Sequence, residues 1–513
     1  MSDGGKTLVV GLDSSTTWAR AVAWTATGEA VAAGRSPIPL AHPTLDRYEQ
    51  DPEDWWRAAA CAIRRVTDSV EPERIAGLSI AHQRETFVPL DCQGAPVRPA
   101  MVWLDRRAKD SVEPLVHRLG AERLLLISGK PPDVTPSLYR WEWMRRHEPE
   151  AFAATAVFAD VHAWLTARLT GSLGTSWASA DPSGAFDIAD QRWSAEILAA
   201  LELDETRMPP AHRPGTVLGE VTRDAAEATG LKSGTPVIAG GGDAQCAALG
   251  IGLAGTAGRD AACLILGSAV VTAVHFNRLR SDPAWHTLGA ASGDGFVHES
   301  CLRTGGTVLD WFVGLVGGDR AAADGLRADL EAAAAEVPPG ARGLILLPWF
   351  AGAMTPNWDA DARGVFFGLT ADHGRGEMYR ALLEGIALDV AMGLALIEAK
   401  TGAVVPACVA VGGGAASTLW CRIIASAAGR PVRRSATTEP AALGAGMCAA
   451  VGCGLHPDMA SAARAMAGPI VDTIDPDRRW AERYSELARI QRDLYPAVED
   501  LYGRLARFAE QND

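Results

Sequence analysis

At 513 residues the chain is longer than one hydrophobic core usually supports, so two or more domains are expected. Apolar residues make up 48% of the chain and charged residues 21%, the balance of an ordinary globular protein. The formal net charge of -14 argues against a nucleic-acid partner or an anionic membrane partner, because either would need a basic surface.

The first residues and the cysteines indicate the compartment. The N-terminal MSDGGKTLVVGLD lacks the basic and apolar regions of a signal peptide, and no apolar run is long enough to cross a bilayer, so a cytoplasmic location is expected. The nine cysteines are scattered from Cys61 to Cys453 without a CxxC pair. Neither a disulfide framework nor a structural zinc site is therefore predicted.

Two strand-turn-strand patterns open the two halves of the chain. In the first, a strand over 6–12 meets a polar turn over 13–17, and a second strand runs over 19–25. Such a turn can hold phosphate, with Asp13 facing a metal ion, or it can be a plain hairpin with a polar tip. The stretch 259–276 repeats the pattern around Gly267 and Ser268, which favours a duplicated architecture with the ligand between the halves.

A strand over 75–80 runs into a charged segment. Arg84 and Glu85 stand between apolar stretches, where burying them unpaired would cost several kcal/mol. They are therefore predicted to line a wet cavity and to contact substrate hydroxyls, the alternative being a surface strand. Trp103 is a candidate apolar wall for a sugar, although the chain has 16 tryptophans.

A glycine-rich corner lies near the midpoint of the chain. A strand over 235–239 leads into three glycines, Asp243 and a helix that begins at 244. The glycines predict unusual backbone torsions and close approach of a ligand. Asp243 has two interpretations that the residue types alone leave open, a helix N-cap or a catalytic carboxylate facing a cleft.

A second glycine-rich connection occurs in the other half. A strand over 408–411 enters three glycines, and a helix follows over 419–428. This connection can seat a flat ring and its ribose against bare backbone, or it can be an ordinary tight turn. A long helix is predicted over 376–400.

Several common motifs fail or are absent. The segment 250–255 matches GxGxxG but follows a helix, so it is not a dinucleotide site. The chain has no GxSxG, HExxH or HRD motif, and Gly5-Lys6-Thr7 lacks the earlier glycine of a Walker A motif. Both absences weaken hydrolase and P-loop interpretations.

Together these segments resemble the FGGY carbohydrate kinase family. The stretches 136–147 (PSLYRWEWMRRH, with Arg140 in place of the usual Lys) and 364–384 (GVFFGLTADHGRGEMYRALLE) are similar to its two signatures. The resemblance implies an α/β protein with two ribonuclease-H-like domains of the actin/hexokinase type and a central cleft where ATP and sugar meet. The expected domains are 1–251, which binds sugar and carries the catalytic residue, and 252–513, which binds nucleotide.

The resemblance also implies roles for individual residues. Asp243 is similar to the catalytic base, Asp13 and Asp243 to the residues that hold Mg2+, and ATP is the implied phosphoryl donor. The implied substrate-binding residues are Gln83, Arg84, Glu85, Trp103, Asp243 and Gln245. The implied nucleotide-binding residues are Ser14, Ser15, Thr16, Thr17, Arg20, Gly267, Ser268, Gly305, Gly413, Gly414 and Ser417.

The substrate is predicted less directly. The segment 83–86 and Trp103 resemble glycerol kinases, whereas the segment 412–417 resembles xylulokinases, whose Met-His-Gly segment is replaced here by Arg84, Glu85 and Thr86. The expected reaction is ATP-dependent phosphorylation of a ketose such as xylulose, with a glycerol or other polyol kinase as the alternative. An actin-like ATPase or chaperone is the alternative from another class. The expected partner is a small sugar or polyol, and a homodimer is a possible assembly.

Overall fold

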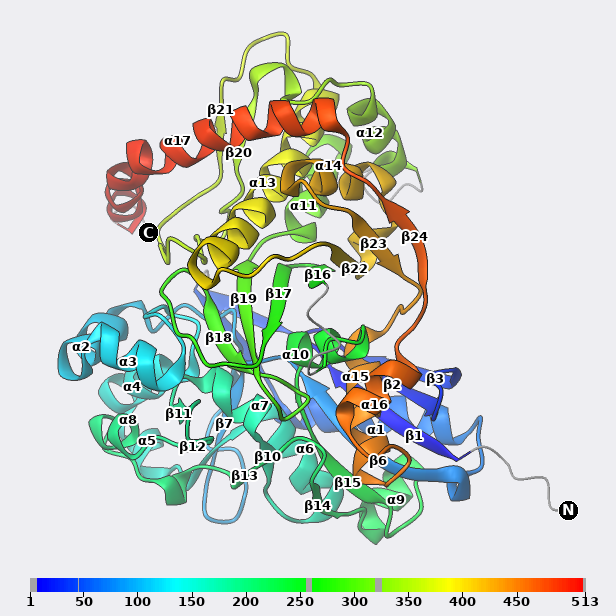
Figure 1. Ribbon diagram of the computed structural model, residues 1–513. Coiled ribbons are helices and arrows are strands. Elements are labelled where there is room, and N and C mark those ends of the chain that lie inside the picture. The colour runs from blue at the N-terminus through cyan, green and yellow to red at the C-terminus, as the bar shows by residue number, and fades with distance from the viewer. Residues whose placement is uncertain (1–6, 45, 255–260, 319–324, 511–513) are drawn as a thin grey trace, which may run out of the picture. The chain divides into compact units, whose positions relative to one another are not determined.

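The computed structural model describes residues 7–44, 46–254, 261–318 and 325–510 (Figure 1). The chain forms two compact units, each made of three segments. Unit 1 contains Met1–Arg259, His275–His298 and Glu439–Gly468, and unit 2 contains Asp260–Val274, Glu299–Thr438 and Pro469–Asp513. Three residues of the expected strands, Lys6, Arg259 and Asp260, lie outside the described residues.

The central sheet of unit 1 has the strand order β14-β15-β6-β1-β2-β3. β1 and β2 pair antiparallel, as do β2 and β3, whereas β6 is parallel to both β1 and β15. Every residue of β1 is buried, as expected for a strand covered on both faces. The six strands are β1 (Leu8–Ser14), β2 (Trp18–Thr25), β3 (Ala30–Pro37), β6 (Ile75–His82), β14 (Val217–Glu220) and β15 (Pro236–Gly242).

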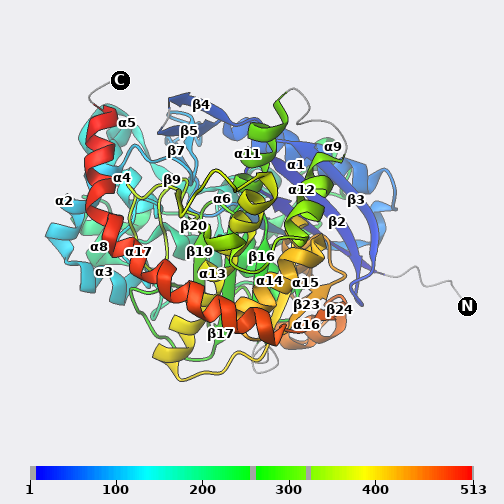
Figure 2. The same cartoon turned by 90° about the horizontal axis from the view of Figure 1, so that it is seen from above.

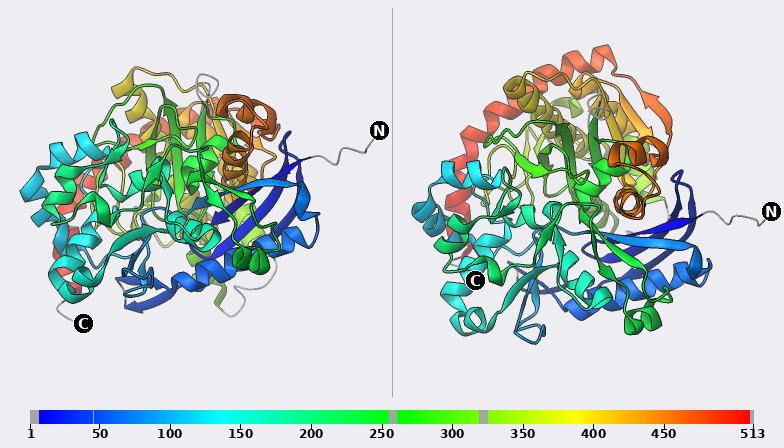
Figure 3. Two further views of the ribbon diagram at one scale, coloured as in Figure 1. Left: turned by 90° about the horizontal axis from the view of Figure 1, so that it is seen from below. Right: turned by 60° about the horizontal axis from the view of Figure 1, so that its bottom comes forward.

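Opposite faces of this sheet pack against helices from distant parts of the chain. Val10 and Leu12 of β1 share an apolar cluster with Trp55 of α1 (Pro52–Thr67). Gly11 points the other way, because side chains alternate along a strand, and a Cβ there would lie 1.8 Å from the carbonyl oxygen of Ala442. Ala442 belongs to α15 (Pro440–Gly452), which Figure 3 shows in orange beside the blue strands. Only glycine permits this close packing of helix on strand.

The rest of unit 1 forms a smaller sheet and a set of short helices. The smaller sheet has the order β4-β5-β8-β7-β9, namely β4 (Ala41–Thr44), β5 (Arg47–Gln50), β8 (Ala100–Met101), β7 (Phe87–Leu90) and β9 (Val157–Asp160). The short strands are β10 (Thr175–Ser176), β11 (Phe186–Asp187), β12 (Arg192–Trp193), β13 (Ala211–His212) and β18 (His286–Gly289). The helices are α2 (Lys109–Leu119), α3 (Ala121–Ser128), α4 (Ser137–His147), α5 (Pro149–Ala154), α6 (Val161–Thr170), α7 (Trp177–Ala180), α8 (Ala195–Ala200), α9 (Arg223–Thr229), α10 (Asp243–Gly250) and α16 (Met459–Met466).

Unit 2 repeats the strand arrangement of unit 1. β16 pairs antiparallel with β17 and parallel with β22, and β22 pairs parallel with β23. The strands are β16 (Ala262–Leu266), β17 (Val270–Phe276), β19 (Phe296–Leu302), β20 (Ile345–Leu347), β21 (Val365–Phe367), β22 (Cys408–Val411), β23 (Val432–Ser435) and β24 (Ile470–Ile474). A hairpin followed by parallel strands in both units is the duplicated α/β fold that the sequence predicts.

Long helices support the sheet of unit 2. α13 (Arg375–Thr401) is the long helix expected over 376–400, and α17 (Arg478–Glu510) crosses it as the red helix in Figure 2. Buried Glu384 accepts hydrogen bonds from Arg380 (2.6 Å) and from the Tyr484 hydroxyl (2.8 Å), so α13 and α17 are joined by polar contacts as well as apolar packing. The other helices are α11 (Gly306–Gly317), α12 (Leu326–Ala335) and α14 (Thr418–Ala428).

Candidate active site

The two candidate carboxylates stand at the same edge of the central sheet of unit 1. Asp13, the next-to-last residue of β1, lies opposite Ala81 of β6, and Gly241 near the end of β15 lies opposite the same residue. Asp243 follows two residues later as the first residue of α10. The pairing of parallel strands therefore brings together two acidic residues that are 230 positions apart.

Asp13 is the buried member of this pair. Burial, followed by the negative charge of Asp243, raises the pKa of Asp13 from 3.8 to about 7. Arg20 partly offsets this shift, with Nη1 3.7 Å from Asp13 Oδ2 and Nε 3.7 Å from Glu439 Oε1. Asp13 Oδ1 and the Ser14 hydroxyl are buried and have no hydrogen-bond partner among the described residues. Such atoms are suited to receive a ligand.

Asp243 differs from Asp13 in exposure and in partner. Its side chain is 41% exposed, its Oδ1 accepts a hydrogen bond from the Ala244 N–H (2.8 Å), and Arg84 Nε lies 3.4 Å from the same oxygen. The N-cap of α10 is Gly242, so Asp243 is the first helical residue rather than the cap. The capping interpretation is therefore wrong.

The three glycines before Asp243 serve close packing rather than unusual torsion. Gly242 has φ of −62° and ψ of 152°, and none of the three has a positive φ, so this part of the expectation is wrong. A Cβ on Gly242 would lie 2.5 Å from Cγ of Arg84, and one on Gly240 would lie 2.0 Å from the carbonyl oxygen of Ile80. Glycine is thus required here so that Arg84 can pass over the strand and reach Asp243.

A histidine from α6 holds the strand that leads to this corner. His162 Nε2 accepts a hydrogen bond from the Gly240 N–H (3.1 Å), which requires that nitrogen to be unprotonated. Burial lowers the pKa of His162 from 6.5 to about 4, so the ring is neutral near pH 7. Sequence patterns did not single out His162, because its partner is 78 residues away.

The Arg84 and Glu85 segment is held by a buried arginine. Glu85 has a left-handed backbone (φ 56°), a conformation that non-glycine residues adopt mainly where other contacts hold them. Its carbonyl oxygen accepts hydrogen bonds from the Ser137 hydroxyl (2.8 Å) and from Arg140 Nη2. Arg140 also donates to the carbonyl oxygens of Val102 (2.8 Å) and Thr135 (2.9 Å). One guanidinium therefore fixes three backbone segments around the candidate sugar site, which a lysine ammonium could do less rigidly.

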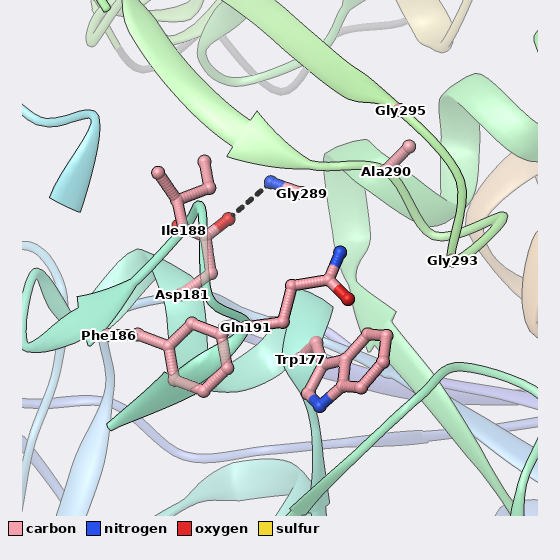
Figure 4. Close-up of a pocket in the computed structure, with 9 residues that line it drawn as sticks. All are labelled: Trp177, Asp181, Phe186, Ile188, Gln191, Gly289, Ala290, Gly293 and Gly295. Atoms are coloured by element: carbon pink, nitrogen blue, oxygen red, sulfur yellow. Dashed lines mark hydrogen bonds between the residues drawn. The ribbon is translucent and has the colours of Figure 1, made fainter. Parts of the chain in front are cut away.

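Gln245, two residues beyond Asp243, is anchored by a buried ion pair. Its Nε2 donates to the Gly289 carbonyl (2.8 Å), and the Gly289 N–H donates to Asp181 Oδ2 (2.6 Å), the bond drawn in Figure 4. Lys130, 3% exposed, is bonded to Asp181 and donates to the Thr287 carbonyl (2.9 Å). Gln245 Oε1 is buried and has no hydrogen-bond partner among the described residues. Lys130 and Asp181 thus fix the strand that orients Gln245, and no sequence pattern indicated either of them.

The remaining candidate residues of unit 1 lie on the turn between β1 and β2 and beside it. The Ser15 N–H and hydroxyl both donate to the Trp18 carbonyl (each 2.9 Å), which closes the turn. Thr16 is half-buried and accepts a hydrogen bond at its hydroxyl from Trp103 Nε1 (2.9 Å), whereas Thr17 is exposed. Gln83 is buried, and its amide bonds to other side chains of unit 1.

Unit 2 contains a cavity of about 460 Å³ at the ends of its own strands, a size suited to a small-molecule ligand. Six nucleotide-binding residues are expected in the second half of the chain, and five of them line this cavity. The sixth, Gly305, is not a lining residue, but its neighbour Gly306 is. The lining comprises Leu266, Gly267, Ser268, Gly306, Leu309, Asp310, Arg327, Glu331, Tyr379, Leu383, Gly413, Gly414, Ala416, Ser417 and Trp420.

Hydrogen bonds hold the segments that form the wall of this cavity. The Gly305 N–H donates to the Ser268 carbonyl (2.7 Å) and the Gly306 N–H to the Gly267 carbonyl (2.8 Å), so the start of α11 is bonded to the β16–β17 turn. Ser417 caps α14 and also donates to Glu331 of α12. Sequence patterns did not indicate Glu331, Tyr379 and Trp420, which come from helices whose inward faces only the fold reveals.

Two further properties concern metals and membranes. Among the described residues no group of three or more His, Cys, Asp or Glu side chains is placed to hold a metal ion. No helix within the described ranges has the length and apolar character needed to cross a bilayer.

The two-unit fold, the paired carboxylates and the separate cavity agree with comparisons with known proteins. Residues 8–250 match the model of the FGGY family of carbohydrate kinases, N-terminal domain, and residues 265–453 match that of its C-terminal domain. The chain belongs to the FGGY family of carbohydrate kinases and is an ATP-dependent carbohydrate kinase.

Within this family, the chain is similar to several individual kinases. The chain is 32% identical to a xylulose kinase of Streptomyces rubiginosus, covering 97% of this chain and 99% of the relative. It is 31% identical to a xylulose kinase of Escherichia coli (strain K12), covering 82% and 85%. The crystal structure of a xylulose kinase from Rhodospirillum rubrum is 30% identical, with a TM-score of 0.86 over 97% of this chain and 100% of that one. A gluconate kinase from Lactobacillus acidophilus, 23% identical over 98% and 100% with a TM-score of 0.88, shares the fold.

Proposed function

We propose that this kinase transfers the γ-phosphoryl group of ATP to a hydroxyl of a ketose, with xylulose as the leading substrate. The observation that carries the proposal is the position of Asp243. It is a partly exposed carboxylate that does not cap its helix, lies against Arg84, and stands at the same sheet edge as Asp13. The relatives named above, which are xylulose kinases, support the choice of sugar.

In the proposed reaction Asp243 accepts the proton of the attacking hydroxyl. Arg84 holds the carboxylate through its Nε, 3.4 Å away, while Gln245 and Glu85 offer further polar contacts to the sugar. Phosphoryl transfer has a loose transition state, so correct orientation of the hydroxyl matters more than early deprotonation. A carboxylate with only modest basicity is sufficient for this role.

Magnesium fits the candidate site at Asp13, with Asp243 nearby. Asp13 Oδ1 is a buried carboxylate oxygen without a hydrogen-bond partner among the described residues, and Mg2+ sites commonly use one or two carboxylates together with substrate phosphates. When bound, the ion would neutralise charge on the phosphates of ATP. The hydroxyls of Ser14, Thr16 and Thr17 and the Arg20 guanidinium would contact the transferred group, on a turn that the Ser15 bonds to Trp18 hold closed.

The expected division of labour remains part of the proposal. Residues 1–251 would bind sugar and supply Asp243, and residues 252–513 would bind the nucleotide in the 460 Å³ cavity, with Gly305 supporting its wall. Tyr379 and Trp420 supply aromatic surface in that cavity, and bare glycine backbone supplies the remainder. We also propose that the protein is located in the cytoplasm and forms a homodimer.

A second candidate substrate class is a polyol such as glycerol. Arg84, Glu85 and Thr86 occupy the place of the xylulokinase Met-His-Gly segment, and an Arg-Glu pair is the glycerol-kinase pattern. The choice between the two classes therefore depends on which substrate the Arg84 and Glu85 side chains accept.

A coupled assay of ADP release tests the proposal. Purified protein is given ATP, Mg2+ and, separately, xylulose, other ketoses, glycerol, other polyols and sugar acids. The proposal expects the highest kcat/KM with xylulose. A higher value with glycerol would support the second candidate, and ADP release that no added sugar or polyol accelerates would support an ATPase instead.

A further inference from the structure

The side-chain amide of a buried glutamine outside the expected site residues makes four hydrogen bonds, two of them to candidate site residues. Gln50 ends β5 and is 2% exposed. Its Nε2 donates to the carbonyl oxygens of Thr16 (2.6 Å) and Pro39 (3.1 Å). Its Oε1 accepts from Gln83 Nε2 (2.8 Å) and Trp55 Nε1 (2.9 Å). The Gln50 amide therefore bonds both to the β1–β2 turn and to Gln83, the first residue of the expected sugar-contacting segment 83–86.

These bonds belong to a closed circuit. The Thr86 hydroxyl donates to Gln83 Oε1 (3.2 Å) and accepts from the Trp103 N–H (3.0 Å). The indole Nε1 of Trp103 then donates to the Thr16 hydroxyl (2.9 Å). The bonds thus run from Thr16 through Gln50, Gln83, Thr86 and Trp103 back to Thr16, and all five residues lie in unit 1.

The circuit changes how two of the expected sugar contacts can act. Both polar atoms of Gln83 are engaged inside the chain, so its amide helps to orient neighbouring residues. The indole N–H of Trp103 is engaged as well, which fixes the plane of a half-buried ring whose surface can still contact a sugar. Satisfied buried networks of this kind hold a single geometry, because breaking any bond leaves a buried polar group unpaired.

We infer that this circuit, with Gln50 at its centre, positions the phosphate-contacting turn relative to the sugar-contacting segment, and that Gln50 and Gln83 are positioning residues. The inference rests on the proposed function. The ring of Trp103 would contact the sugar, and its N–H is bonded to Thr16 in the β1–β2 turn. The sugar-binding surface and the phosphate-contacting turn are therefore held at a fixed distance. Misplacement of reacting groups by about 1 Å can cost 100-fold in rate, so the circuit should affect turnover more than binding.

The test compares three substitutions. Trp103→Phe removes the N–H that reaches Thr16 and keeps an aromatic wall. Thr86→Val breaks the circuit at a second point with little change of volume. Trp55→Phe is the matched control, because it also removes an indole N–H bonded to Gln50 but lies outside the circuit. The readouts are kcat and KM for the best sugar of the substrate screen, the Kd for ADP and the melting temperature.

Trp103→Phe and Thr86→Val are each expected to lower kcat by about 10- to 100-fold. The KM for sugar and the Kd for ADP should stay within about threefold, and the double variant should be little worse than either single one because the residues act as a unit. Trp55→Phe should lower the melting temperature and leave kcat within about twofold. If one circuit variant does not fold, the other still decides the question.

The possible failures can be told apart. If the wild-type enzyme is active and Trp103→Phe and Thr86→Val match Trp55→Phe in kcat, the circuit has no positioning role while the proposed function stands. A rise in KM alone would make Trp103 a simple binding surface and would also overturn the inference. A wild-type enzyme that phosphorylates no sugar or polyol would overturn the proposed function and this inference together.

Discussion

Asp243 and Arg84 form the contact on which the proposed chemistry depends. The guanidinium is mostly buried and the carboxylate is partly exposed, so the pair presents the acid to ligands on one side only. Gly242 makes this possible, since a side chain there would collide with Arg84.

Replacing Asp243 with Asn should lower kcat by about 100-fold or more, because general-base groups contribute on this scale. An asparagine Oδ1 can still accept the Ala244 N–H bond, so folding and the Kd for ADP should be preserved. Steady-state kinetics together with ADP titration check both parts. Turnover within a few-fold of wild type would remove Asp243 from the mechanism.

The Lys130 and Asp181 pair supports a prediction about stability. Both side chains are almost fully buried, and burial lowers the pKa of Lys130 and raises that of Asp181, so each depends on the other to stay charged. Replacing Lys130 with Met leaves a buried carboxylate without its cation and should cost about 3–5 kcal/mol. The KM for sugar should rise as well, because Asp181 holds Gly289 and Gly289 holds Gln245.

An exposed ion pair of the same unit provides the control for this prediction. Arg123 and Glu196 are each about half exposed, and ion pairs in contact with solvent contribute little to stability. Glu196→Gln should therefore change the melting temperature and the KM very little. Equal effects of Lys130→Met and Glu196→Gln would show that the buried pair does not hold the strand.

At the scale of elements, α13 carries a buried acid in its middle turns. Asp389 is 3% exposed, and its Oδ1 accepts a hydrogen bond from Trp349 Nε1 (3.4 Å). Burial raises the pKa of Asp389 from 3.8 to about 7. The folded protein therefore keeps this proton over a range of pH in which the unfolded chain releases it.

This difference predicts how stability depends on pH. Between about pH 4 and pH 7 the folded state binds more protons at Asp389 than the unfolded state, so the free energy of unfolding falls as pH rises and levels off above about 7. An asparagine side chain at this position would not titrate. Asp389→Asn should therefore melt close to wild type near pH 4 and higher than wild type at pH 8, by an amount on the order of a few kcal/mol in unfolding free energy.

Melting temperatures of both proteins from pH 4 to 8.5 test this prediction. Asp13 also has a raised pKa, but it is present in both proteins and cancels in the comparison. A constant difference at every pH would mean that Asp389 is not protonated in the folded state.

Sequence patterns predicted most elements and the position of the acidic corner, for physical reasons. Strands such as β1 and helices such as α13 follow from apolar patterning. The glycines from 412 follow β22 as predicted, whereas the glycines 240–242 form the end of β15. The pattern misjudged why the glycines precede Asp243, because close packing by Arg84 depends on a residue 158 positions earlier. Gln50, Lys130 and His162 were missed for the same reason: their partners lie far away in sequence.

At the scale of the whole molecule, neither unit is a continuous stretch of chain. Residues 439–468 belong to unit 1, although they follow residues 299–438 of unit 2 in the sequence. The returning α15 packs on β1, β6, β15 and α10, and most of its residues are buried. Its glycines are part of the fit, since a Cβ on Gly444 would lie 1.9 Å from the carbonyl oxygen of Cys246.

Because α15 is synthesised long after the sheet that it covers, the chain must fold in stages. About 200 residues separate the end of β15 from the start of α15, which is roughly 10–40 s of synthesis at ordinary ribosome speeds. During that time one apolar face of a finished sheet has no cover, so the nascent chain should need chaperone protection, and cells depleted of chaperones should yield more insoluble protein. A fragment that stops after Gly250 should aggregate or lack a sharp melting transition, and adding the 439–468 peptide should recover part of it.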